Sequence, residues 1–168
     1  MLDTHFTTMA RYNAWANAEV YAAAATLPDA EYRRARPAAF FGSLHGTLNH
    51  LLVVDRLWFG RIDGSDPGRL TLDQILHEDF AELRAARERE DRRIVTVVEG
   101  LDEAALAAPL RYTRPNGTLC VNPLASVLLH MVLHAVHHRG QVHDMLSQTA
   151  VPPPSLDMHR VLKPNPDD

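Results

Sequence analysis

The stretch NPLASVLLHMVLHAVHHRGQVHDML (residues 122–146) decides the fold, because it has the pattern of one long helix with sharp limits. Asn122 suits the N-cap of that helix and Pro123 its first position. Apolar residues recur up to Leu146, and the prolines at 152–154 cannot continue a helix. Four of the chain's ten histidines fall within nine positions of this predicted helix: His130, His134, His137 and His138.

Three further segments have apolar residues at helical spacing, and together with the last helix they predict an all-α four-helix bundle. The first runs from Asp3 or Thr4 to Thr26. The second begins after Ser43 as its N-cap and ends in the turn-rich segment 60–68. The third is expected to start at Thr71, where Thr71 and Gln74 have capping-box spacing, and to run to about Val98.

A length of 168 residues lies in the usual range for one domain, so residues 1–168 are expected to form a single domain. Residues 31–41 predict a connection with a short helical turn, and residues 110–121 predict a small hairpin around Pro-Asn-Gly. The alternating charges of residues 82–93 are typical of a solvated helix face. The polar C-terminal tail is expected to be flexible from about residue 160.

Composition excludes several classes of function. Of the 168 residues, 46% are hydrophobic, which is enough for one core. The sequence has no uninterrupted apolar run long enough to span a membrane and no signal-peptide pattern. These two observations predict a cytoplasmic protein. The single cysteine, Cys120, excludes an internal disulfide. The net charge is −4 and the basic residues are scattered, so neither a nucleic acid nor a membrane is an expected partner.

His130, His134, His137 and His138 share one face of this helix, because residues four apart on a helix differ by only about 40°. Apolar residues lie among them, so this face is expected to point toward the core. Burying several imidazoles without partners costs a few kcal/mol each and lowers their pKa values. A bound metal ion would compensate for that cost, whereas a set of hydrogen-bonded core histidines is the alternative without metal.

Histidines at positions i and i+4 can direct ring nitrogens at one ion, which makes His134 and His138 the first candidate ligands. Spacing alone leaves His137 as a rival to His138. His50 lies among leucines in the second helix and is the best candidate for a third ligand. His130 is expected to support the ligands or to line the entrance.

The segments LNHLLVVDRLW (residues 48–58) and HAVHHRGQV (residues 134–142) resemble the DinB/YfiT-like superfamily of metal-dependent enzymes, over nearly the whole chain. The resemblance implies a four-helix bundle, often a homodimer, with a divalent metal between helices. It assigns the three metal ligands to His50, His134 and His138. It also implies an enzyme that uses a low-molecular-weight thiol, as transferases and isomerases of this superfamily do.

The favoured hypothesis is therefore a divalent-metal-dependent enzyme that activates a low-molecular-weight thiol for transfer to an electrophilic small-molecule substrate. Zinc, nickel or iron would each suit imidazole ligands. A metal-assisted hydrolase and a non-catalytic metal-binding or stress-response bundle are the alternatives. Several other side chains are expected to have structural roles. Cys120 is expected to be a small buried hydrophobe, and Trp58 is expected to fill the core rather than to form a pocket wall. Asp55 is expected to be a structural partner, and Arg139 and Gln141 are expected to form supporting hydrogen bonds.

Overall fold

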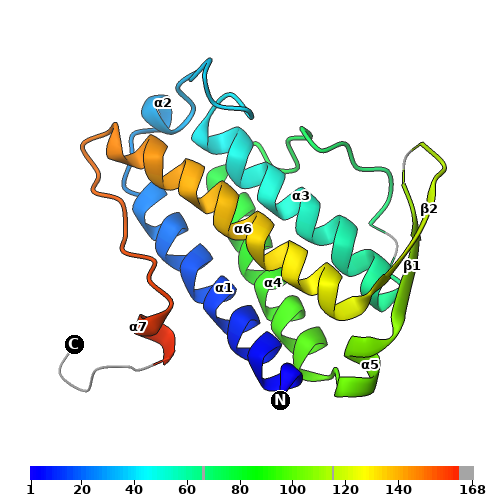
Figure 1. Cartoon of the computed structure of the whole chain (residues 1–168). Coiled ribbons are helices and arrows are strands. Elements are labelled where there is room, and N and C mark those ends of the chain that lie inside the picture. The colour runs from blue at the N-terminus through cyan, green and yellow to red at the C-terminus, as the bar shows by residue number, and fades with distance from the viewer. Residues whose placement is uncertain (66, 115, 163–168) are drawn as a thin grey trace.

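Four long helices run side by side in the computed structural model, which describes residues 1–65, 67–114 and 116–162 (Figure 1). Helix α1 packs against α4 and α6, and α3 packs against the same two helices. The long helices are α1 (Leu2–Ala24), α3 (Leu44–Asp63), α4 (Phe80–Glu99) and α6 (Leu124–Ser147). The protein is thus mainly helical, as the sequence predicted.

Shorter elements connect the long helices. An antiparallel hairpin lies beside one end of α3 and α6, and pairs Leu110 with Asn122 and Tyr112 with Cys120 (Figure 1). These elements are α2 (Asp29–Tyr32), α5 (Glu103–Ala107), β1 (Pro109–Thr113), β2 (Leu119–Pro123) and α7 (His159–Leu162). Helix α2 overlaps the predicted helical turn within 31–41 only at residues 31 and 32, and the predicted hairpin is confirmed.

The limits of α3 follow from its sequence. Ser43 is the N-cap, as predicted, and its side chain accepts a hydrogen bond from the amide of Gly46 at 3.0 Å. The helix extends to Asp63, so it includes the first four residues of the segment 60–68 that was expected to end it, and it stops where Gly64 has a positive φ of 76°. Two apolar clusters, one centred on Leu48 and Leu52 and the other on Phe59, bury this helix against its neighbours.

The predicted start of the third long helix is wrong. Thr71 and Gln74 do form a hydrogen-bonded turn, but α4 begins at Phe80, with the side chain of Asp79 accepting a bond from the amide of Glu82. The Asn49 side-chain oxygen accepts bonds from the amides of Leu76 and His77. Tertiary contacts with α3 therefore hold this segment as a loop, although its local sequence favours a helix.

The predicted start of the last helix is also displaced. Asn122 and Pro123 belong to β2, where they pair with Leu110 and Pro109, and α6 begins at Leu124 without a side-chain cap. The Asn122 side chain instead accepts a hydrogen bond from the Tyr112 hydroxyl at 3.1 Å. The tail predicted to be flexible from about residue 160 overlaps α7, and residues 163–168 lie outside the described residues.

A layer of buried polar side chains connects all four long helices. The Arg87 guanidinium of α4 binds Asp55 of α3 at 2.6 Å and Asp91 at 2.9 Å. Asn17 of α1 donates to Asp91 at 2.9 Å and accepts from Arg139 of α6 at 3.0 Å. Residues 82–93 are therefore not simply a solvated face: the expectation is wrong for Arg87, Glu90 and Asp91, which are buried.

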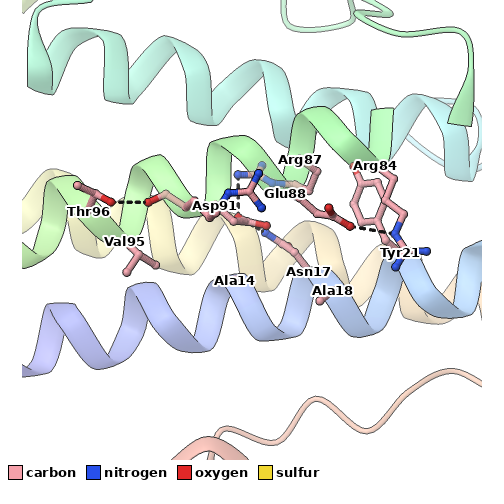
Figure 2. Close-up of a pocket in the computed structure, with 11 residues that line it drawn as sticks. Ala14, Asn17, Ala18, Tyr21, Arg84, Arg87, Glu88, Asp91, Val95 and Thr96 are labelled. Atoms are coloured by element: carbon pink, nitrogen blue, oxygen red, sulfur yellow. Dashed lines mark hydrogen bonds and ion pairs between the residues drawn. The ribbon is translucent and has the colours of Figure 1, made fainter. Parts of the chain in front are cut away.

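Figure 2 shows part of this layer between α1 and α4, with Asn17, Asp91 and Arg87 side by side. They line a groove of about 420 Å³ between α1 and α4, and no residue of α6 belongs to its lining. Burial raises the pKa of Asp91 to about 6, although Arg87 and Asn17 favour its charged form. A carboxylate in such surroundings depends on Arg87 to remain ionised.

Candidate metal centre

Three histidines from two helices meet in the structure. His50 projects from α3, and His134 and His138 project from successive turns of α6. One ring nitrogen from each of the three lies within 4.8 Å of the other two, and the Nε2 atoms of His50 and His134 are 3.3 Å apart. This group of three could hold a metal ion. The structure thus brings together the three residues that the sequence singled out.

Two of these rings are held by hydrogen bonds that set their protonation. His50 donates from Nδ1 to the carbonyl oxygen of Leu72 at 2.7 Å, and His138 donates from Nδ1 to the side-chain oxygen of Gln141 at 2.8 Å. A carbonyl oxygen only accepts, so the proton of each neutral ring resides on Nδ1. The Nε2 lone pairs of both rings are then free to bind a cation.

His134 lies between the other two rings and has the most perturbed environment. Burial lowers its pKa to about 3, with the neighbouring His138 and His50 acting in the same direction. Its Nδ1 is buried and has no hydrogen-bond partner among the described residues. Burial also lowers the pKa values of His50 and His138. The three imidazoles are therefore neutral, and one ring nitrogen of each lies close to the other two. Such a set of nitrogen ligands suits a divalent cation.

Phe41 closes one side of the histidine group. Its ring stacks on His50 with 3.7 Å between the ring centroids and an angle of 19° between the planes, and its edge contacts His138. Such an apolar wall limits access of water to the group. Sequence reasoning treated residues 31–41 only as a connection. The one available signal was the aromatic pair Phe40-Phe41, which Gly42 separates from the cap at Ser43.

Gly46 allows Phe41 to take this position, and it provides a test. A Cβ at Gly46 would overlap the Phe41 carbonyl oxygen, whereas a Cβ at Gly140 would meet nothing within 4 Å. We expect Gly46→Ala to destabilise the protein by about 1–3 kcal/mol and to move the Phe41 ring off His50. Urea unfolding measures the first effect. Loss of the ring-current shift of the His50 ring protons in the NMR spectrum measures the second.

The matched control is Gly140→Ala in the middle of α6, which is expected to stabilise the helix by up to about 1 kcal/mol. Its His50 resonances should remain where they are in the unmodified protein. Equal stability of the Gly46 and Gly140 variants would show that the Phe41 backbone can move away at no cost.

His130 and His137, which share a face of α6 with His134 and His138, lie outside this group. His137 is exposed, and its Nε2 is 3.2 Å from the Gln141 side-chain nitrogen. His130 is also exposed, and its ring centroid is 6.0 Å from that of His134 and 5.6 Å from that of Trp58. The described residues therefore supply three converging ligand atoms and no fourth from His, Cys, Asp or Glu.

The remaining candidates have mainly structural contacts. Asp55 binds Arg87, as expected of a structural partner, and Arg139 forms interhelical bonds with Asn13 and Asn17. Cys120 is half-buried in β2, and its sulfur lies 4.0 Å from the Thr118 carbonyl oxygen. Sequence reasoning missed the Leu72 carbonyl, because a backbone acceptor in a loop leaves no mark in the residue pattern.

Hollows lie on both sides of the histidine group. On one side, a hollow of about 540 Å³ includes Phe40, His137 and Gln141, the residue that binds His138. On the other, a hollow of about 320 Å³ lies against the hairpin and includes Trp58 and His130. Trp58 is only half-buried and helps to line this hollow, so it is not purely core filler.

The fold and this centre define a mainly helical protein with a three-histidine group that could bind a metal. The model of the DinB family matches residues 1–168, and the chain belongs to that family. It is similar to Protein DinB of Bacillus subtilis (strain 168), with 26% identity over 144 residues that cover 82% of this chain and 81% of that protein. None of the helices in the described parts of the chain has the length and apolar character needed to cross a membrane.

Proposed function

We propose that this chain is a divalent-metal-dependent enzyme that activates a low-molecular-weight thiol for transfer to an electrophilic small molecule. The observation that carries the proposal is the convergence of three neutral imidazoles, of which His50 and His138 have their second nitrogen already bound to an acceptor. His50, His134 and His138 are the proposed ligands. Zinc, nickel or iron is the proposed metal.

A divalent cation held by these neutral ligands would keep its full charge and would lower the pKa of a bound thiol toward neutral pH. The protein residues position and shield this chemistry. The Leu72 carbonyl and Gln141 hold His50 and His138 in the ligating orientation, and Phe41 excludes water from the side of His50. The two hollows offer separate places for a thiol and an electrophile.

A thiol is favoured over water as the nucleophile, because Asp55, the carboxylate nearest in sequence to His50, is not available as a general base. A hydrolase needs a general base within hydrogen-bond reach of the attacking water. Asp55 is instead bound to Arg87, and no carboxylate of the described residues belongs to the histidine group. A three-ligand group also leaves positions open for a substrate, which a closed structural site does not.

The proposal includes the architecture and setting inferred from the sequence. These are a DinB/YfiT-like four-helix bundle formed by residues 1–168 as one domain, a homodimer, and a cytoplasmic location. The pairwise packing of α1, α3, α4 and α6 supports the bundle.

Metal content per chain tests the proposal first. We expect gently purified protein to carry about one divalent ion per chain by elemental mass spectrometry, and His134→Ala to lose it. His143→Ala is the matched control, because His143 lies on the same helix outside the histidine group and should leave the ion in place. Negligible metal that added zinc, nickel or iron does not restore would contradict the proposal.

The thiol step is tested separately with the metal-loaded protein. The unmodified protein should accelerate the reaction of L-cysteine with 1-chloro-2,4-dinitrobenzene, and His134→Ala should not. If the protein carries its full metal content but accelerates the reaction of neither L-cysteine nor any other small thiol, the thiol step is wrong and the protein is a non-catalytic metal-binding protein.

A further inference from the structure

The hollow beside the hairpin combines aromatic walls with an unpaired positive charge. It lies where β1, β2, α3 and α6 meet, next to the histidine group. Its lining consists of Trp58, Tyr112, Arg114, Asn122, Ser126, Val127 and His130. None of these residues is acidic, although the whole chain carries a net charge of −4. The hollow therefore differs in charge from the protein as a whole.

Trp58 and Tyr112 form the aromatic part of the hollow. Their ring centroids are 5.0 Å apart and their planes meet at 72°. The guanidinium carbon of Arg61 lies 4.6 Å from the Trp58 centroid and 5.0 Å from that of Tyr112. The Tyr112 hydroxyl is bound to Asn122. These contacts hold both rings in place, so a flat ligand meets a preformed surface.

Arg114 supplies the charge. Its side chain is exposed and makes no ion pair or hydrogen bond with any residue that the structure describes. Its backbone, in contrast, is held by hydrogen bonds with Thr118 and Gly117 at the end of the hairpin. A guanidinium on an anchored backbone and without an internal partner suits bidentate binding of a carboxylate.

His130 connects this hollow to the histidine group. It lines the hollow, contacts the Trp58 ring and precedes His134 by one helical turn. A ligand held by Arg114 and the aromatic walls can thus extend along the seam between α3 and α6 toward His134. This places one end of the ligand near the proposed reaction centre.

From these contacts we propose that the hollow binds the electrophilic substrate, and that this substrate is an aromatic carboxylate. Arg114 binds the carboxylate, and Trp58 and Tyr112 contact the ring. This assignment rests on the proposed function for the role of the ligand as a substrate. Binding of an aromatic carboxylate in the hollow can be measured independently of any turnover.

The test uses the fluorescence of Trp58 in a Trp15→Phe background, where Trp58 is the only tryptophan. The probes are benzoate and its neutral analogue benzamide, added to the metal-loaded full chain. We expect benzoate to change the Trp58 emission at saturable concentrations and to bind at least about tenfold more tightly than benzamide. Arg114→Gln should remove this preference.

Arg111→Gln is the matched control, because Arg111 is an exposed arginine of β1, three residues before Arg114, and does not line the hollow. It should retain the preference for benzoate. Equal affinity for the two probes, no saturable change in emission, or an equal effect of both arginine variants would overturn the proposal. Displacement of benzoate by L-cysteine would assign the hollow to the thiol and would contradict the assignment to the electrophile.

Failure of this inference and failure of the proposed function give different results. Metal content and the reaction of L-cysteine with 1-chloro-2,4-dinitrobenzene, which carries no carboxylate, report on the proposed function alone. Both should be unchanged in Arg111→Gln, and metal content should also be unchanged in Arg114→Gln. If benzoate binds as expected in a protein that holds no metal, the hollow is a carboxylate site and the metal-dependent role is wrong.

Discussion

Replacing Arg87 by methionine is expected to destabilise the protein by about 3–5 kcal/mol. Arg87 is 2% exposed and lies between the carboxylates of Asp55 and Asp91, at 2.6 and 2.9 Å. Methionine has a similar length but no charge, so both buried carboxylates would lose their cationic partner. Each must then remain charged in a medium of low polarity or take up a proton.

Urea unfolding at neutral pH measures this loss, with Arg84→Met as the control. Arg84 lies one turn earlier on α4 and pairs with Glu88 at 3.1 Å, but both side chains are largely exposed. Its replacement should cost less than about 1 kcal/mol. A similarly small loss for Arg87→Met would show that the two carboxylates are satisfied without it.

The stability of the metal-free protein is expected to fall as the pH drops below about 6.5, because His134 resists protonation in the folded state. The pKa of His134 is lowered from 6.5 to about 3, mainly by burial. A histidine whose pKa is lower in the folded chain stabilises the fold above its unfolded pKa, and that contribution is lost as the pH falls toward the folded value. Since His134 is only partly buried, we expect a loss on the order of 2 kcal/mol for this residue between neutral pH and pH ~4.

The measurement compares urea midpoints of chelator-treated protein across this pH range with those of His134→Gln, which cannot take up the proton. The unmodified protein should lose more stability than the variant. Asp91 acts in the opposite direction, because its raised pKa of about 6 makes acid favour the folded chain, but its contribution is common to both proteins. Parallel curves for the two proteins would contradict the prediction for His134.

The pH dependence and the proposed metal binding have the same origin. Protons and divalent cations compete for the same imidazole nitrogens, so a site that disfavours the proton keeps its lone pairs available to a metal near neutral pH. Added metal should therefore increase the stability of the unmodified protein most where the histidines are neutral. The buried Nδ1 of His134 and the facing Nε2 atoms of His50 and His134 account for this preference.

Much of this protein follows from local sequence. The apolar spacing of the long helices, the cap at Ser43 and the hairpin around Pro-Asn-Gly were all predictable, because each depends on residues close together in the chain. The same holds for the pairing of His134 with His138, since helical geometry places residues four apart on one face. The convergence of His50 with that pair was expected from its apolar surroundings and from the family resemblance.

Only the tertiary structure decided the rest. The segment around Thr71 has a helical start signal, yet Asn49 binds its continuation at Leu76 and His77 and holds it as a loop. That loop brings the Leu72 carbonyl to His50, and the fold brings Arg87 between Asp55 and Asp91. Sequence patterns record which residues share a helix face, whereas a hydrogen bond to a distant backbone or the burial of a charge depends on which helices pack together.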